Sequence, residues 1–170
     1  MICPHCGYDN LPGAEECAQC LQDLTHLDRP VGHNRIERAL LDDPVASVQP
    51  AKAVTVKPGT TVRQAVQTMI EHNVGAVLVV GDANRILGIF SERDVLLRVA
   101  GLRDQYEDLP VSHFMTNDPE TVSAEDKLAF ALFKMDGGGY RHLPVLAPGK
   151  PPGMISVRDL LRHVMSLCLE

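Results

Sequence analysis

The chain has 170 residues, of which 45% are hydrophobic and 22% are charged, and its net charge is −6 with a pI near 5.6. This length can build one or two compact cores, and the acidic balance argues against DNA, RNA or anionic lipid as a partner. The sequence begins without the apolar stretch of a signal peptide and has no apolar run of about 18 residues. It therefore predicts a soluble, cytoplasmic protein.

Residues 1–29 contain two C-x-x-C pairs, CPHC and CAQC, ten residues apart. Four cysteine sulfurs can occupy tetrahedral corners, an arrangement that suits zinc in a closed structural site. The predicted ligands are Cys3, Cys6, Cys17 and Cys20. The segment resembles a zinc ribbon, while iron in a rubredoxin-like site and a disulfide pair are the alternatives. We interpret His5 as a bystander and the fifth cysteine, Cys168, as incidental.

The residues around the cysteines limit what this segment can do. Gly7 permits the positive φ that a metal-binding turn often needs, whereas Leu21, at the matching place, does not offer that freedom. Four filled positions would leave no open site for metal catalysis. Five acidic residues and one arginine through residue 29 disfavour binding to a phosphate backbone. We expect self-association or docking to a protein.

Residues 30–44 are predicted to be a linker that carries one short helix. Asn34 can cap this helix, and Glu37 stands at the reciprocal position of a capping box. Ile36, Ala39 and Leu40 share one face, so we expect the helix to lean on the domain that follows.

From residue 45 onward the chain contains an internal repeat, with an offset of 66 residues that becomes 65 after a hairpin loop. Apolar residues at three- and four-residue spacing predict amphipathic helices over 62–70 and 128–135, with Thr60 and Ser123 as N-caps. The segments AVLVV and ILGIF, and then LPVL and GMI, predict buried hairpins. The predicted order of elements is strand, helix, strand, strand, helix, and it occurs twice in an α/β fold.

The repeated motifs GIFSERD, at 88–94, and GMISVRD, at 153–159, each place a serine three residues before an aspartate. Ser91 with Asp94, and Ser156 with Asp159, can form a helix N-cap and its first-turn carboxylate. The same geometry can hold a ligand, because a serine donates to phosphate and a carboxylate accepts from ribose hydroxyls. Both copies carry an arginine before the aspartate, which favours at least one working site.

Together with the strands GAVLVV and RHLPV and the HFMT lead-in at 113–116, these motifs resemble a tandem pair of CBS domains over about residues 45–165. The resemblance implies two β-α-β-β-α repeats, 45–101 and 102–170, that form one module. It also implies two clefts that often hold adenosine derivatives such as AMP, ATP or S-adenosylmethionine. It implies a sensor and not a catalyst.

By this resemblance, each cleft joins the motif of one repeat to the lead-in and middle strand of the other. The first cleft would contain Ser91, Arg93, Asp94, Met115, Glu120, Tyr140, Arg141 and His142. The second would contain Gln49, Val54, Val74, Gly75, Ala76, Ser156, Arg158 and Asp159. Arg141 and His142 make the first cleft the better candidate for a polyphosphate, although they can also form a solvated strand end. For Val54, Val74 and Val77, core packing is the favoured interpretation.

The leading hypothesis is a regulatory module that binds an adenine nucleotide such as AMP, ADP or ATP and relays this to a partner through the ribbon. The runner-up is an adaptor with empty clefts. An enzyme is a weak third, because the sequence has no G-x-S-x-G elbow, H-E-x-x-H helix or P-loop. The resemblance further implies a homodimer. Apolar residues of the closing helices, which are the last predicted helix of each repeat, could form its interface or be buried within the chain: Leu96, Val99, Leu160, Leu161 and Val164.

Overall fold

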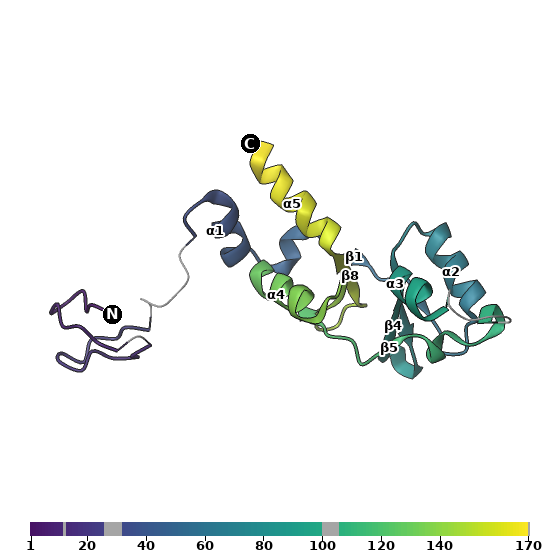
Figure 1. The fold of residues 1–170 in the computed structure, drawn as a ribbon, viewed down its shortest axis with the longest axis horizontal. Helices are drawn as coiled ribbons and strands as arrows, with labels where there is room; N and C mark the ends of the chain where they lie inside the picture. Colours follow the sequence, from purple (N-terminus) through teal and green to yellow (C-terminus); the bar gives the residue numbers. More distant parts are fainter. Residues whose placement is uncertain (12, 26–31, 100–105, 170) are drawn as a thin grey trace.

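The computed structural model describes residues 1–11, 13–25, 32–99 and 106–169. It has two four-stranded sheets with helices packed on them (Figure 1), which confirms the predicted α/β class. The strand, helix, strand, strand, helix order is also found twice. The predicted boundaries at 29/30 and 101/102, and two of the ribbon's counted charges, Asp28 and Arg29, lie outside the described residues.

The first sheet has the order β2-β3-β4-β5, in which β2 and β3 are parallel and the other neighbours are antiparallel. Its strands are β2 (Thr55–Val56), β3 (Ala76–Val80), β4 (Ile86–Ser91) and β5 (Thr116–Asn117). The second sheet has the order β1-β8-β7-β6, with β6 and β7 parallel. Its strands are β1 (Ala51–Lys52), β6 (Val122–Ser123), β7 (His142–Leu146) and β8 (Gly153–Ser156).

The two repeats exchange their edge strands. The lead-in to the second repeat, residues 111–117, supplies β5 to the first sheet, where Thr116 pairs with Ile89. The lead-in to the first repeat, residues 45–52, supplies β1 to the second sheet, where Ala51 pairs with Met154. Backbone ladders therefore tie the repeats together, which supports one module rather than two separate domains.

The described α-helices differ in length and in how their apolar residues are arranged. They are α1 (Arg35–Asp42), α2 (Val62–Glu71), α3 (Glu92–Asp94), α4 (Leu128–Gly138) and α5 (Val157–Leu169). A π-helical turn, Val95–Val99, continues α3. Single 3-10 turns lie at Val45–Val48, Asp82–Asn84, Tyr106–Asp108 and Val111–His113.

Helix α1 begins as the sequence predicts, since the Asn34 side chain accepts a hydrogen bond from the Glu37 N–H at 2.9 Å. Glu37 reaches back to the N–H of His33, one residue before the cap. Leu40 packs against the second-repeat core, so the helix contacts the following domain as predicted.

The predicted caps of the two central helices are wrong. Thr61, not Thr60, caps α2, because the Thr60 hydroxyl is already used to close the preceding turn. Lys127 stands at the N-cap of α4, and Ser123 instead gives its backbone N–H to the carboxylate of Asp126. Local competition for N–H groups decides both cases, which residue type alone does not reveal.

Three apolar clusters fill the module, and each of them combines residues of both repeats. The first-repeat core includes Val111 and Phe114 from the second lead-in. The second-repeat core includes Val45 from the first lead-in. A third cluster lies on the face of the first sheet and receives Met154 from β8. Burial of these lead-ins holds the exchanged strands in place.

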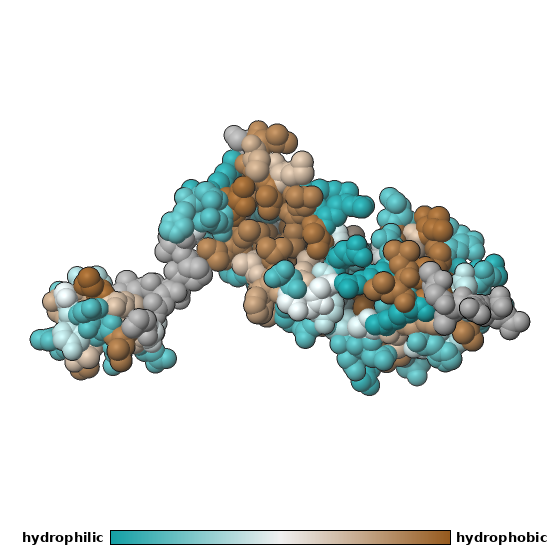
Figure 2. Space-filling model, viewed as in Figure 1, coloured by the Kyte–Doolittle hydropathy of each residue, from teal (hydrophilic) through white to brown (hydrophobic). Residues whose placement is uncertain are grey.

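Some of the closing-helix residues proposed for an interface are buried within the chain. Val99 and Leu160 belong to the two repeat cores, whereas Leu96 and Leu161 are exposed and Val164 is half-buried. Hydrophobic surface gathers over α4 and α5 (Figure 2), where Phe133, Leu161 and Met165 are exposed. Over the described ranges, none of the helices combines the length and the apolar character needed to span a bilayer.

Candidate functional site

The two S-x-x-D motifs form the predicted capping arrangement. In the first motif, one Asp94 oxygen accepts from the Ser91 N–H at 2.9 Å and from its hydroxyl at 2.7 Å. The other oxygen lies 3.3 Å from the Arg98 guanidinium, and the Asp94 side chain is 9% exposed. Both carboxylate oxygens are therefore used inside the protein.

The second motif repeats this geometry in a more open setting. Asp159 accepts from the Ser156 N–H at 2.8 Å and from its hydroxyl at 2.7 Å. Arg162 stands 3.4 Å away, and the Asp159 side chain is 34% exposed. The two aspartates thus have the same local role and different access to solvent.

A cavity of about 330 Å³ lies beside the first motif, with walls from both repeats. Seven of the eight residues that the sequence predicts for the first cleft border it: Ser91, Arg93, Asp94, Glu120, Tyr140, Arg141 and His142. Met115, predicted here as well, packs against the first-repeat core. Gly75, predicted for the second cleft, borders this cavity, close to His142.

Three arginine side chains line this cavity beside three carboxylates, and the arginines differ in how they are held. Arg98 donates to the carbonyls of Phe114 and Met115, at 2.7 and 3.0 Å. Arg93 donates to the carbonyl of Gly139 at 2.9 Å. No hydrogen bond or ion pair joins the guanidinium of Arg141 to another residue in the described ranges, so it is available to an anion.

His142 stands on the strand that leads out of the cavity. Burial lowers its pKa below the ordinary value; the Glu92 carboxylate opposes this shift and the Arg141 guanidinium adds to it. The imidazole is therefore neutral near pH 7 and can act as a hydrogen-bond donor or acceptor rather than as a cation.

The residues predicted for the second cleft are distributed differently. Gln49 and Arg158 are exposed, while Ala76 is 3% exposed in the cluster that contains Met154. Val54 and Val74 pack against the first-repeat core, and Val77 is fully buried. For these three valines the structure agrees with core packing, the interpretation that the sequence favours.

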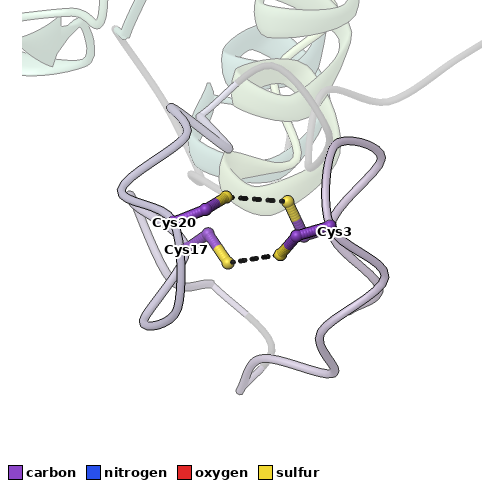
Figure 3. Close-up of side chains that lie close together, drawn as sticks. Cys3, Cys17 and Cys20 are labelled. Atoms are coloured by element: carbon purple, nitrogen blue, oxygen red, sulfur yellow. Dashed lines mark hydrogen bonds between the residues drawn. The ribbon is translucent and has the colours of Figure 1, made fainter.

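The four predicted cysteine ligands come together in the N-terminal segment. Cys3 and Cys20 place their sulfurs 3.7 Å apart, and Cys6 and Cys17 place theirs 3.6 Å apart (Figure 3). All four sulfurs lie within 4.8 Å of one another. A tetrahedral zinc site with bonds of about 2.3 Å has sulfur–sulfur edges near 3.8 Å, so the donor set fits the metal.

The two cysteine turns have the same backbone conformation. The N–H of Gly7 donates to the backbone carbonyl of Cys3, and the N–H of Leu21 donates to the backbone carbonyl of Cys17, each at 2.9 Å. Both residues have positive φ, 73° for Gly7 and 59° for Leu21. The expectation that Leu21 avoids this region is wrong, because the shared turn imposes it on either residue.

Sequence reasoning missed several residues of these sites. Glu92, Arg98 and Gly139 line the cavity, and Arg98 follows its motif aspartate by four residues, a helical spacing that could have indicated it. Asn10, next to the cysteine turns, is buried and bonded to both of them. No sequence pattern points to Asn10.

Comparison with known proteins gives a consistent result. A sequence model of the CBS domain family matches residues 45–101 and 111–166. An uncharacterized 17.7 kDa protein of Acidianus ambivalens is 37% identical over 124 residues, which covers 72% of this chain and 74% of that protein. The Arabidopsis thaliana protein CBSCBSPB1 is 31% identical over 140 residues, covering 82% of this chain. The match spans 25% of that plant protein's length.

Solved structures share the fold. The CBS-domain containing protein ATU1752 of Agrobacterium tumefaciens has a TM-score of 0.64 at 31% identity, covering 70% of this chain and 94% of that one. The structure of CBSX2 in complex with AMP has a TM-score of 0.60 at 23% identity, covering 74% and 98%. The CBS pair of MJ0100, in complex with 5′-methylthioadenosine and S-adenosyl-L-methionine, has a TM-score of 0.64 at 17% identity, covering 72% and 96%.

Proposed function

Because this chain belongs to the CBS domain family, we propose that it is a regulatory module that binds an adenosine-containing nucleotide between its two repeats. The observation that carries the proposal is the cavity of about 330 Å³, which has walls from both repeats and a free arginine beside it. Fold relatives in complex with AMP and with S-adenosyl-L-methionine support the same ligand class. Binding, rather than catalysis, is the proposed activity.

We assign roles to the cavity residues by their chemistry. The guanidinium of Arg141 binds a phosphate, with Arg93 able to join it, because both can donate paired hydrogen bonds to an anion. Tyr140 and His142 offer flat faces to an adenine ring. Ser91 and Asp94 form the polar floor, where a ribose hydroxyl would donate to the carboxylate. Glu120 lies at the rim, 2.8 Å from Lys134.

The second motif, with Ser156, Arg158 and Asp159, is proposed as a second site. Its greater openness at Asp159 favours a ribose contact there. Gln49 stays part of this proposal, as do the backbone groups of Val54, Val74 and Ala76. A nucleoside without a long phosphate chain suits such surroundings.

We further propose that Cys3, Cys6, Cys17 and Cys20 bind one structural zinc ion. Sulfur–sulfur distances of 3.6 and 3.7 Å support this, and four thiolates would leave no open coordination position. Iron is the alternative metal for the same donor set. Elemental analysis of protein prepared without chelator tests this, and a result of iron or of no metal would contradict the zinc assignment. With its metal bound, the ribbon would serve self-association or docking to a protein partner.

A homodimer is proposed for the CBS pair, with the hydrophobic surface over α4 and α5 as the contact (Figure 2). Exposure of Phe133, at 72%, and of Leu161, at 55%, supports an apolar interface there. Light scattering at micromolar concentration should give twice the chain mass, and a monomeric mass would rule the dimer out.

The test of nucleotide binding is calorimetric titration with AMP, ADP, ATP, NAD and S-adenosylmethionine. Loss of a charge-assisted hydrogen bond of about 1.5–3 kcal/mol should make Arg141→Ala bind roughly tenfold to a hundredfold more weakly. Arg158→Ala probes the second site, and Arg85→Ala, in the β3–β4 loop outside the cavity lining, is the matched control. An absence of binding to the parent protein at millimolar ligand would favour the adaptor instead.

A further inference from the structure

Asn10 is a buried polar side chain in a segment with very little core. It is 6% exposed, and Asp94 is the other polar residue with comparable burial in the described ranges. The apolar cluster around it consists of Cys3, Cys17 and Leu24, with a few half-buried neighbours. Burying an amide without partners would cost the small unit free energy, so the partners of Asn10 are informative.

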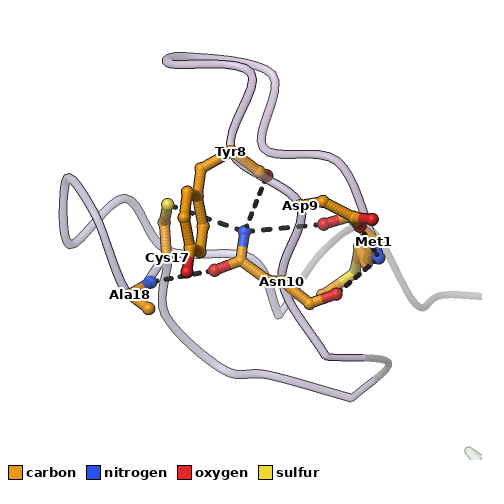
Figure 4. A network of polar contacts seen from close by, with 6 residues as sticks. All are labelled: Met1, Tyr8, Asp9, Asn10, Cys17 and Ala18. Atoms are coloured by element: carbon orange, nitrogen blue, oxygen red, sulfur yellow. Dashed lines mark hydrogen bonds and ion pairs between the residues drawn. The ribbon is translucent and has the colours of Figure 1, made fainter.

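The Asn10 amide is bonded to both cysteine turns (Figure 4). Its Oδ1 accepts from the Ala18 N–H at 2.9 Å, within the second C-x-x-C pair. Its Nδ2 donates to the Tyr8 carbonyl at 3.1 Å and to the Met1 carbonyl at 3.5 Å, and lies 3.6 Å from the Cys17 sulfur. One side chain thus holds the two turns together and points an N–H at a ligand sulfur.

Such an N–H has a specific effect on a thiolate. It orients the sulfur and stabilises its negative charge, as second-shell partners of metal ligands commonly do. Four thiolates around one divalent ion leave a net negative cluster, so a donor at Cys17 reduces the repulsion among the sulfurs. The amide oxygen, in contrast, acts only on the backbone of Ala18.

We propose that Asn10 is a positioning residue of the metal centre, which holds the Cys17 sulfur by its N–H while its oxygen joins the second cysteine turn to the first. This inference rests on the proposed metal site. It goes beyond that site because it assigns metal affinity to a residue that is not a ligand.

The two halves of the amide can be separated by substitution. Asn10→Asp keeps an oxygen acceptor for Ala18 but replaces the N–H with a carboxylate oxygen beside the Cys17 sulfur. Asn10→Ala removes both contacts. Gln22→Ala, at an exposed position between the cysteine turn and Leu24, is the matched control because its side chain makes no hydrogen bond within the described ranges.

The measurement is Zn²⁺ affinity by chelator competition, with the full-length chain and its variants. We expect Asn10→Ala to weaken binding by about 10- to 100-fold, the usual cost of a lost second-shell partner, and Asn10→Asp to weaken it at least as much. Gln22→Ala should stay within about twofold of the parent. If Asn10→Asp bound Zn²⁺ as tightly as the parent, the N–H would have no role and the inference would be overturned.

A spectrum of the Co²⁺-loaded protein supplies a second readout at saturating metal, where weakened variants are still folded around the ion. The sulfur-to-cobalt charge-transfer band should shift in both Asn10 variants and not in Gln22→Ala. Unshifted bands would contradict the inference. A parent protein that bound neither Zn²⁺ nor Co²⁺ would instead remove the metal site itself, so the two failures are distinguishable.

Discussion

The guanidinium of Arg93, in the first repeat, donates a hydrogen bond of 2.9 Å to the carbonyl of Gly139, in the second. Gly139 is the left-handed C-cap of α4, with φ of 63°. Carbonyls at a helix C-terminus have no partner within the helix and carry partial negative charge, which favours a cation there. This bond spans the cavity that we propose for the nucleotide.

We predict that Arg93→Ala weakens nucleotide binding by about tenfold, since a phosphate in the cavity would lose one charged donor worth about 1.5 kcal/mol. Because Arg93 is exposed, the free energy of unfolding should fall by less than about 1 kcal/mol. Calorimetric titration and urea unfolding of the same preparation check the two parts. A large loss of stability with unchanged affinity would mean that Arg93 only stabilises the fold and does not contact the nucleotide.

The two motif aspartates should differ in their effect on stability. Asp94→Ala leaves the part-buried Ser91 N–H without its acceptor and removes the ion pair of Arg98, which keeps its two backbone carbonyls, so it should cost about 2–3 kcal/mol. Asp159→Ala removes a more exposed cap, which is worth about 1 kcal/mol. Urea unfolding of both variants without ligand gives the comparison. Equal losses would show that the difference in exposure, 9% against 34%, has no energetic weight.

The motif glycines allow the exchanged strands to approach closely. A Cβ at Gly88 would lie 2.8 Å from the Thr116 carbonyl oxygen, which is backbone, and would also meet the Met115 side chain. At Gly153 the nearest atom is Cβ of Pro50, at 3.2 Å. Overpacking in Gly88→Ala should therefore lower the free energy of unfolding by about 1–3 kcal/mol, and Gly153→Ala should lower it by less than about 1 kcal/mol. The midpoint of urea unfolding measures both, and the reverse order would contradict this packing.

Leu21 offers a stabilising change. Its φ of 59° strains a non-glycine residue by about 1 kcal/mol, which glycine would relieve. Its side chain is 73% exposed, so little burial is lost. At the proposed zinc site, folding of the ribbon would be coupled to metal binding, so Leu21→Gly should bind zinc about fivefold more tightly. Leu11→Gly, at an 81% exposed residue without positive φ, should show no gain in the same chelator competition.

Stability should decrease in mild acid through His142. Burial holds its pKa below the ordinary value of 6.5, so the unfolded chain takes up its proton first as the pH falls. The contribution is fully present above pH 6.5 and is lost as the pH falls from 6.5 through the folded pKa. Urea unfolding at pH 7.5, 6.5 and 5.5 should show a weaker acid dependence in His142→Gln than in the parent. Parallel curves would be inconsistent with a buried, neutral imidazole.

Much of this protein could be predicted from its sequence because the relevant signals are local or repeated. Helix and strand periods, the duplicated S-x-x-D motif and the short spacing of Cys3, Cys6, Cys17 and Cys20 depend on neighbouring residues along the chain. Such patterns predicted the α/β class, the two repeats and the cysteine cluster. The resemblance to a CBS pair, in turn, implied the seven predicted residues that border the first cavity.

What only the tertiary structure decided involves groups that lie far apart in the sequence or that compete for one partner. The exchange of β1 and β5 depends on whether a distant backbone can approach Gly153 or Gly88. The placement of Gly75 in the first cavity depends on how the repeats meet. Asn10 is buried because the two cysteine turns converge on it, and Leu21 takes a strained φ because its turn requires it. Sequence patterns record the preferences of residues for local structure, whereas packing and hydrogen-bond satisfaction between distant segments determine which of those preferences prevail.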